Sequence, residues 1–484
     1  DGGIAKFWYN SAQQLRFSQN AVQQSQNKYS YTKFDALGRP LEAGVFTEAT
    51  QATALNAAND NTYPLAGTYT LNEVVRTFYH TQPLALNTAL GWNPQNLNNR
   101  VAAVAYYETM TSGTTAYTNA LFYDYDIHGN VKRMLTHHNY NYFRQDRYKT
   151  VDYNYDLYSG KVLEVVYQAT KEDQFIHRYT YDDDNRITGV MTSRDGVQWD
   201  EDASYYYYLH GPLARMELGD QKVQGIDYAY TVHGWLKGVN DNTLTARRDM
   251  GKDGAAQLKS NRWVARDAFG YSLTYFNQNA EVDYKPIVTP TADANWLATN
   301  ESAIMSSAGD NLYNGNIRMM VTAIAGTNNL SIGTVARKYK YDQLQRLKQA
   351  KTYTAATLES ANSWTGAAAT TAHQSDYSYD LNGNITHLTR RGNTALVDDL
   401  SYVYYDNNLN SLSNVNTLPN KGNRLANVQD TPGTAAAFDD DIDPAQGSTN
   451  YSYDALGRLV RDDQEEIASI TWNVQNKVTK ITHS

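Results

Sequence analysis

The chain is 484 residues long, contains no cysteine and carries a formal net charge of −9. Without cysteine it forms no disulfide, no thiolate metal site and no cysteine nucleophile, and an acidic balance without a basic stripe argues against binding to nucleic acid. No stretch approaches the roughly 18 consecutive apolar residues of a membrane-spanning helix. Tyrosine dominates the aromatic residues, with 40 copies against 11 phenylalanines and 8 tryptophans, and its ring and hydroxyl suit a strand that is half buried.

Residues 1–119 begin with a polar segment rich in glutamine and asparagine and then reach FDALGRP at Phe34–Pro40. This is the first copy of a pattern whose fullest version is YSYDALGRL at Tyr451–Leu459. The alanine-rich stretch Glu48–Asn61 predicts a short helix. We expect residues 1–119 to form the N-terminal part of a repeat array with irregular insertions.

The pattern in YSYDALGRL predicts a β-hairpin. Tyr451 and Tyr453 are two residues apart, so their rings lie on one face of an extended strand. Asp454 supplies a short polar side chain that hydrogen-bonds to the turn backbone, and Gly457 accepts the positive φ of a tight hairpin. Arg458 then starts the returning strand.

Residues 120–245 carry the pattern densely, and each copy holds about two strands and two turns. Asn185 replaces the glycine in one copy, because asparagine is the next-best residue for a left-handed turn position. The copies in this segment are YDIHGNV at Tyr125–Val131, YDLYSGKV at Tyr155–Val162, YDDDNRI at Tyr181–Ile187 and YTVHGWL at Tyr230–Leu236.

Residues 246–310 interrupt the pattern with RRDMGKDGAAQ and two prolines, so we expect a loop-rich insertion with a short helix at Asp293–Met305. Repeats resume over residues 311–484. Two biased segments, Ala355–His373 and the acidic stretch from Phe438, are expected to be loops. The copies here are YDQLQRL at Tyr341–Leu347, YDLNGNI at Tyr379–Ile385 and a divergent WNVQNKV at Trp472–Val478.

These copies predict two sets of structural positions. The first set supplies the turns: Asp126, Gly129, Asp182, Asn185, Asp342, Asp380, Gly383, Asp454 and Gly457. The second set places paired rings on the strands that precede those turns: Tyr123, Tyr125, Tyr179, Tyr181, Tyr339, Tyr341, Tyr377, Tyr379, Tyr451 and Tyr453.

The acidic residues are interpreted as structural. Carboxylates of the turn set follow the spacing of the turns, which favours a capping role over a catalytic or calcium-binding row. The cluster Asp439–Asp443 resembles the start of an EF-hand loop, but Pro444 stands where glycine is needed and Asn450 where a bidentate glutamate is needed. A solvated acidic loop is therefore the favoured interpretation, with calcium binding left open.

Other chemistry lacks a supporting pattern. His137 and His138 are adjacent, so on a strand they face opposite ways, and no histidine spacing matches a metal site. There is no GxSxG elbow and no glycine-rich phosphate loop. Tyrosine rings stack on sugars where they are exposed, but rings that recur at repeat positions are better explained as the packing between neighbouring strands.

The motifs YSYDALGRL, YDLNGNI, YDIHGNV and YDQLQRL resemble the YD repeats of the Rhs family of bacterial proteins, which is related to the teneurins and to the C component of insecticidal toxin complexes. Longer phrases strengthen the resemblance, which covers most of the chain from about residue 120 onward. They are ARMELGDQKVQGIDYAYTVHGWLKGVN, DAFGYSLTYF, NLYNGNIRMMVTAI and EEIASITWNVQNKVTKI, and they look like the stretch that precedes the Rhs-repeat-associated core.

The resemblance implies a β-sheet that spirals into a hollow shell around a hypervariable C-terminal toxin. In this family the core ends in an Asp-Pro-containing segment that releases the toxin by self-cleavage. Asp443 and Pro444 are the nearest dipeptide here, but they precede another repeat. We therefore expect the toxin and the cleavage segment to lie outside Asp1–Ser484, and we interpret the chain as a piece of a longer polypeptide.

The sequence thus predicts an all-β fold, a YD-repeat antiparallel sheet that curves or encloses a volume, with few helical or loop insertions. The expected function is that of a non-catalytic shell segment of an exported Rhs-type toxin; the alternative is a cell-surface adhesin or carbohydrate-binding module. No catalytic, cofactor-binding or metal-binding residue is predicted. Expected partners are the remainder of the same polypeptide and secretion machinery or a cell-surface complex, and the expected location is secreted or at the cell surface.

Overall fold

The chain consists almost entirely of β-strands wherever the computed structural model describes it. The described residues are 3–49, 57–82, 92–114, 116–139, 147–245, 249–254, 261–276, 312–326, 333–354, 366–393, 395–406, 421–431, 442 and 446–484. Helical structure there is limited to α1 (Ala21–Ser25) and the 3-10 turn η1 (Ala57–Asn59). η1 falls within the predicted helix Glu48–Asn61, whereas the helix predicted at Asp293–Met305 and the acidic cluster's aspartates lie outside the described residues.

Contacts divide the chain into two compact units. Unit 1 comprises Asp1–Thr180, Thr192–Trp199 and Tyr451–Ser484, and unit 2 comprises Tyr181–Met191 and Asp200–Asn450. The division of the sequence into four segments by repeat content stays a prediction. The two units are defined by spatial contacts, which the density of repeats in the sequence does not measure.

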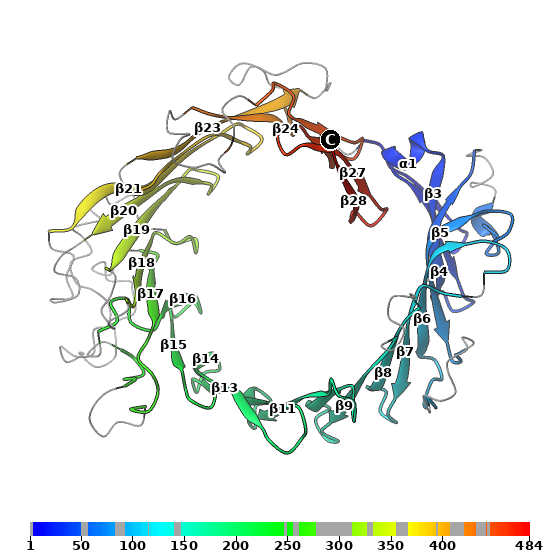
Figure 1. Ribbon diagram of the computed structural model, residues 1–484, viewed down its shortest axis with the longest axis horizontal. Helices are drawn as coiled ribbons and strands as arrows, with labels where there is room; N and C mark the ends of the chain where they lie inside the picture. The colour runs from blue at the N-terminus through cyan, green and yellow to red at the C-terminus, as the bar shows by residue number, and fades with distance from the viewer. Residues whose placement is uncertain are drawn as a thin grey trace. The chain divides into compact units, whose positions relative to one another are not determined.

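Unit 1 contains two antiparallel arrays in which strands adjacent in sequence pair with one another. The long array begins at the N-terminus, and the four-stranded array is C-terminal (Figure 1). The long array consists of β1 (Lys6–Tyr9), β2 (Leu15–Gln19), β3 (Lys28–Phe34), β4 (Pro40–Thr47), β5 (Leu71–Tyr79), β6 (Val101–Met110), β7 (Asn119–Tyr125), β8 (Val131–His138), β9 (Tyr148–Tyr155), β10 (Val162–Tyr167) and β11 (Phe175–Tyr181). The short array consists of β25 (Tyr451–Tyr453), β26 (Leu459–Asp462), β27 (Ile467–Trp472) and β28 (Val478–His483).

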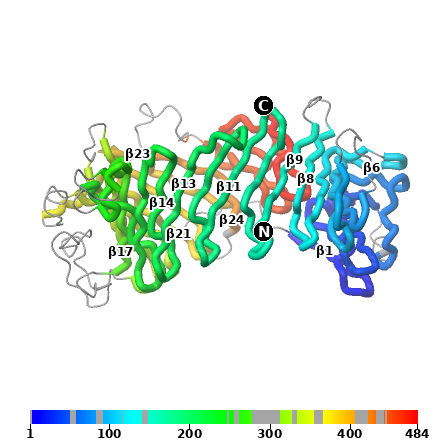
Figure 2. The backbone as a smooth tube through the Cα atoms, turned by 90° about the horizontal axis from the view of Figure 1, so that it is seen from below, coloured from blue at the N-terminus to red at the C-terminus, as the bar shows by residue number. Residues whose placement is uncertain are grey.

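Unit 2 follows the same rule, and its strands from β13 onward pair antiparallel in chain order (Figure 2). β12 (Ile187–Ser193) spans residues of both units. The others are β13 (Asp200–Tyr207), β14 (Leu213–Leu218), β15 (Gln224–Tyr230), β16 (Leu236–Val239), β17 (Phe269–Thr274), β18 (Met319–Ile324), β19 (Val335–Tyr341), β20 (Leu347–Thr354), β21 (Ala368–Tyr379), β22 (Ile385–Arg391), β23 (Leu396–Asp406) and β24 (Lys421–Asp430). The predicted all-β class and antiparallel sheet are confirmed.

One sequence expectation about a loop is wrong in part. The alanine- and threonine-rich segment Ala355–His373 was expected to be loop, but β21 already begins at Ala368. Threonine is β-branched and fits a pleated, half-buried surface, and pairing with β20 supplies the hydrogen bonds that composition alone does not reveal.

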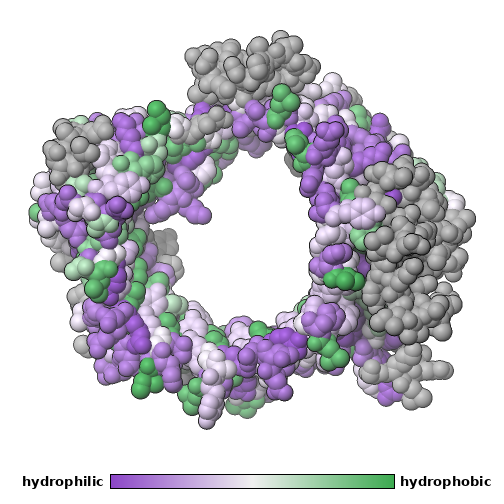
Figure 3. All heavy atoms as spheres, turned by 180° about the vertical axis from the view of Figure 1, so that it is seen from behind, coloured by the Kyte–Doolittle hydropathy of each residue, from purple (hydrophilic) through white to green (hydrophobic). Residues whose placement is uncertain are grey.

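The densest apolar core lies in unit 1. Phe46 is fully buried and contacts the rings of Phe17 and Tyr31 at centroid distances of 6.0 and 5.8 Å, with edge-to-face geometry. Outside such cores, Figure 3 shows hydrophilic and hydrophobic residues interleaved over the visible face. This mixture fits a sheet whose strands alternate between packed and wet side chains.

Residues from the two ends of the chain meet in unit 1. A Cβ built on Gly3, which precedes β1, would lie 3.3 Å from the carbonyl oxygen of Ala455, in the turn between β25 and β26. The short C-terminal array therefore packs with strands that precede it by about four hundred residues of sequence.

Candidate functional site

The predicted turn aspartates each occupy the first position of a hairpin turn. In the clearest copy, the N–H of Asp454 donates to the carbonyl of Arg458, and the N–H of Gly457 donates to the carbonyl of Asp454, both at 3.0 Å. The Asp454 carboxylate accepts the N–H groups of Leu456 at 2.8 Å and Arg458 at 3.0 Å. The side chain therefore satisfies backbone donors that the tight turn leaves free.

The same carboxylate contact recurs at the other predicted positions. The N–H four residues later donates to Asp126, Asp182, Asp342 and Asp380 at 2.9, 2.9, 2.9 and 2.8 Å. At Asp342, the N–H of Arg346 and then its guanidinium lower the carboxyl pKa, against a desolvation effect that raises it. These contacts agree with the predicted role of the aspartates as caps of the hairpin turns.

The predicted left-handed positions have positive φ. Gly129, Gly383 and Gly457 have φ of 99°, 94° and 80°, and Asn185 has φ of 68°. In the copy that lacks both residues, Gln345 takes this conformation with φ of 64°. Glycine is therefore favoured but not required at this position.

One copy of the turn in unit 2 was not predicted from the sequence. Tyr208 takes the place of the aspartate, its N–H donates to the carbonyl of Pro212 at 2.9 Å, and Gly211 has φ of 116°. The signal was the glycine three residues after Tyr208, which the unusual first residue obscured.

In three of the five predicted pairs, the second tyrosine links one hairpin to the preceding one. The hydroxyl of Tyr379, at the end of β21, donates to the carbonyl of Leu347, at the start of β20, at 2.7 Å. Tyr125 and Tyr341 make the same bond at 2.8 Å to Val101 and Ile317. Further copies join Tyr79 to Pro40, Tyr155 to Val131, Tyr207 to Ile187, Tyr275 to Leu236 and Tyr404 to Ile385.

The remaining predicted rings line the same half-buried strands. The rings of Tyr123 and Tyr125 are 6.3 Å apart between centroids, as expected for neighbours on one face. The half-buried positions also include Tyr179, Tyr181, Tyr339, Tyr377, Tyr451 and Tyr453.

Turn arginines extend the link between hairpins. Arg346 donates through Nε to Asp342 at 2.6 Å, and its guanidinium carbon lies 4.6 Å from the ring centroid of Tyr379 in the next hairpin. The set Asp342, Arg346, Tyr379 and Leu347 thus forms a chain of contacts, which we call the hairpin seam. Arg39, Arg186 and Arg458 make the equivalent pairs with a turn aspartate and a following ring.

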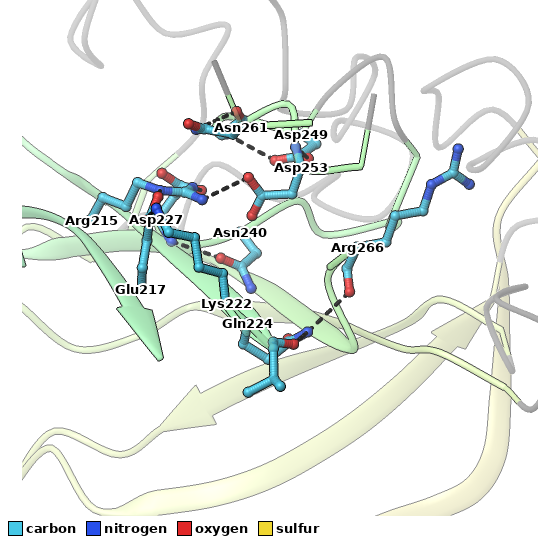
Figure 4. A network of polar contacts seen from close by, with 12 residues as sticks. Arg215, Glu217, Lys222, Gln224, Asp227, Asn240, Asp249, Asp253, Asn261 and Arg266 are labelled. Atoms are coloured by element: carbon cyan, nitrogen blue, oxygen red, sulfur yellow. Dashed lines mark hydrogen bonds and ion pairs between the residues drawn. The ribbon is translucent and has the colours of Figure 1, made fainter. Parts of the chain in front are cut away.

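A different cluster lies in unit 2, where Arg215 is surrounded by carboxylates (Figure 4). Arg215, on β14, donates through Nε to Glu217 at 2.9 Å, through Nη1 to Asp227 at 2.6 Å and through Nη2 to Asp253 at 2.7 Å. Lys222 donates to the second oxygen of Glu217 at 2.7 Å. The Arg215 side chain is 10% exposed and that of Asp253 is 0% exposed, so these ion pairs are shielded from water.

Two more aspartates complete this Arg215 network. Asp249 accepts the backbone N–H groups of Gly251 at 2.9 Å and Asp253 at 2.6 Å, which fixes the loop that follows it. Asp267 is 9% exposed. Over the ranges that the structure describes, Oδ1 of Asp267 and Oδ2 of Asp253 are buried without a hydrogen-bond partner.

Burial dominates the protonation of the network. Desolvation raises the pKa of Asp253 to about 6, although hydrogen bonding to Arg215 opposes the shift. Desolvation, reinforced by Asp249, Asp253 and Asp227, raises the pKa of Asp267 to about 9. Because no spacing rule relates residues scattered from 215 to 267, this network could not be predicted from the residue pattern.

The adjacent histidines of the sequence analysis face different neighbours. His137 is buried, its Nδ1 lies 2.6 Å from the hydroxyl of Tyr117, and its ring stacks on Tyr148 at a centroid distance of 4.2 Å. Nδ1 of His138 lies 3.1 Å from the side-chain oxygen of Asn119. Burial lowers the pKa of His137, and the charges of Arg147 and His138 act in the same direction.

Two further kinds of feature are absent from the described residues. No three histidine, aspartate or glutamate side chains there converge in a way that would hold a metal ion. No described helix is long and apolar enough to cross a membrane.

Comparison with known proteins relates the fold to that of large complexes. No family model matches the chain, and no curated protein matches it. Chains from crystal structures of TcdB2-TccC3-Cdc42, TcdB2-TccC3, and TcdB2-TccC3 without its hypervariable C-terminal region are similar at TM-scores of 0.55, 0.56 and 0.54, with sequence identities of 14%, 13% and 13%. In each case the match covers 100% of this chain and 18% of the other. The chain therefore shares a fold with the TcdB2-TccC3 chains and spans 18% of their length.

Proposed function

We propose that this chain is a non-catalytic wall segment of an Rhs-type, YD-repeat toxin, which encloses a C-terminal toxin domain until delivery. The observation that carries the proposal is the hairpin seam. In one copy Tyr379 links β21 to the carbonyl of Leu347, and the same link recurs in both units. In these repeats the aromatic and charged residues join neighbouring hairpins. Such a repeat builds an extended sheet rather than a reactive pocket.

The shared fold supports this proposal. One similar crystal structure is of TcdB2-TccC3 without its hypervariable C-terminal region, which fits the expectation that a variable cargo and a constant wall are separable parts. We propose that the rest of the polypeptide, including the toxin and any self-cleavage segment, supplies the activity. Secretion or cell-surface display follows from this role.

The second candidate, a carbohydrate-binding adhesin, has less support. Sugar platforms need exposed ring faces, whereas Tyr341 and Tyr379 are half buried and their hydroxyls donate to backbone carbonyls. A glycan array with the isolated chain separates the candidates, because the wall proposal expects no saturable binding.

Imaging the full-length polypeptide that contains this chain by electron cryomicroscopy tests the proposal directly. We expect the repeat sheet to surround density for the C-terminal domain. A solid sheet sandwich without an internal volume would overturn the proposal. A parallel toxicity assay should find activity with the full polypeptide and none with residues 1–484 alone; activity in the latter would contradict a non-catalytic role.

A further inference from the structure

The Arg215 network carries more negative than positive charge. Within the described ranges, Arg215 and Lys222 donate hydrogen bonds to its carboxylates, whereas Glu217, Asp227, Asp249, Asp253 and Asp267 bring five carboxylates. The guanidinium directs Nε, Nη1 and Nη2 to three different carboxylates, so it has little capacity for the others. Burying an unbalanced set of like charges is unfavourable unless counter-charges or protons are taken up.

Close packing favours the proton as the missing counter-charge. A Cβ built on Gly225 would lie 2.3 Å from Oδ2 of Asp253 and 2.1 Å from Nη2 of Arg215, and a Cβ on Gly251 would lie 2.4 Å from Oδ2 of Asp227. Backbone therefore fills the space beside these oxygens. A proton on a carboxylate needs no additional volume.

The other charged groups near the network, among the residues that the structure describes, do not restore the balance. The charge of Lys252, in the same loop, favours the ionised form of Asp249, which brings the described cationic side chains to three against five carboxylates. The Arg266 side chain points away from the Arg215 network in Figure 4, and its carbonyl oxygen accepts a hydrogen bond from Gln224 at 3.0 Å.

The network joins two separate parts of unit 2. Segments 249–254 and 261–268 lie between β16 and β17, and they are tied to the hairpin formed by β14 and β15. Besides the Arg215–Asp253 pair, the N–H of Ala265 donates to the carbonyl of Lys222, and the N–H of Ala268 donates to the side chain of Gln224, both at 3.0 Å. The attachment of segments 249–254 and 261–268 to the hairpin therefore depends on the Arg215 network. The charge of that network changes when its carboxylates bind or release protons.

We propose that the Arg215 network is a proton-dependent clasp, which holds segments 249–254 and 261–268 on the β14–β15 hairpin when protonated and loosens them when deprotonated. Asp253 and Asp267 have raised pKa values when the clasp is closed, so the closed form binds more protons than the open form above the ordinary aspartate pKa. The clasp is therefore strongest in mild acid. Its stability falls as pH rises through about 6 for Asp253 and about 9 for Asp267.

Hydrogen exchange of the complete chain, followed by mass spectrometry between pH 5 and pH 8, tests the clasp. After correction for the intrinsic exchange rate, we expect the opening of the peptides that contain Asp253, Ala265 and Ala268 to increase about tenfold per pH unit for each linked proton. The turn amide of Asn384, also in unit 2, serves as the internal reference. Equal pH dependence of the clasp and the reference would overturn the proposal, even without any variant.

A pair of matched variants assigns the effect to a side chain. Asp267→Asn removes one titrating group at nearly constant volume and should flatten the pH dependence of the clasp peptides. Asp184→Asn changes a carboxylate whose side chain is 74% exposed and should leave the dependence as in the unmodified chain. Retention of the full dependence in Asp267→Asn would contradict the proposed role of this residue.

Discussion

The hydroxyl of Tyr379 donates a 2.7 Å hydrogen bond to the carbonyl oxygen of Leu347, and so joins the end of β21 to the start of β20. The ring of the same tyrosine lies under the guanidinium of Arg346, which is paired with Asp342. Together these contacts explain why tyrosine rather than phenylalanine suits this place in the repeat. A phenylalanine would keep the packing and lose the link.

Replacement of Tyr379 by phenylalanine should therefore destabilise unit 2 by about 1 kcal/mol, the typical net contribution of one hydrogen bond. Urea unfolding measures the change. Tyr206→Phe is the matched control, because the Tyr206 residue is 48% exposed and should change stability little. Equal effects of the two substitutions would remove the special role of the seam.

Valine at Gly383 should destabilise the β21–β22 hairpin by about 2 kcal/mol, because a β-branched residue is strained at a φ of 94°. Gly457→Val, at a φ of 80°, should behave in the same way in unit 1. Gly447→Val is the control, since a Cβ at Gly447 meets no atom within 4 Å. Thermal unfolding distinguishes these variants; an unchanged midpoint for Gly383→Val would contradict the turn assignment.

Alanine at Gly225 should disrupt the Arg215 network through close contact rather than backbone strain. Its Cβ would lie 2.1 Å from Nη2 of Arg215, so the ion pairs must shift, with an expected loss of about 1–3 kcal/mol. Urea unfolding measures the loss, with Gly447→Ala as the control. Wild-type stability in Gly225→Ala would mean that the network is looser than the structure indicates.

Acid should destabilise unit 1 through His137. Burial lowers the pKa of His137 in the folded chain, so the unfolded chain binds more protons at this residue, and stability falls as pH drops below about 6.5, the ordinary histidine value. His137→Phe keeps a ring beside Tyr148 and should reduce the loss of stability between pH 7 and pH 5. Urea unfolding at both pH values checks this, and an unchanged loss in the variant would assign the effect elsewhere.

Much of the turn structure could be predicted from the sequence, because the rules for turns involve residues only a few positions apart. Asp454 and Gly457 lie three residues apart in one turn, so their roles follow from backbone geometry alone. The paired tyrosines predicted a shared strand face, but the partner of the Tyr379 hydroxyl depends on which strands are neighbours and at what register. Tyr208 was missed as a turn residue because its turn is held by backbone bonds without a carboxylate cap.

The Arg215 network could not be predicted with rules of this kind. Arg215, Asp227 and Asp253 contact one another only after a hairpin and a long connection have folded, and no spacing in the sequence encodes that meeting. The segment containing Asp249 and Asp253 was expected to be a loop-rich insertion, and a loop of that kind normally carries solvated carboxylates. Burial of these residues is a property of tertiary packing.

The presence of β25–β28 in the same compact unit as β1–β10 has a consequence for biosynthesis. A ribosome releases the chain from its N-terminus, so the early strands of unit 1 emerge long before β25–β28, which complete the same unit. Contacts across so wide a sequence separation form slowly. Nascent unit 1 therefore stays incompletely covered while the roughly 250 residues from Asp200 to Asn450 are translated, and during this interval a chaperone would find the most exposed apolar surface.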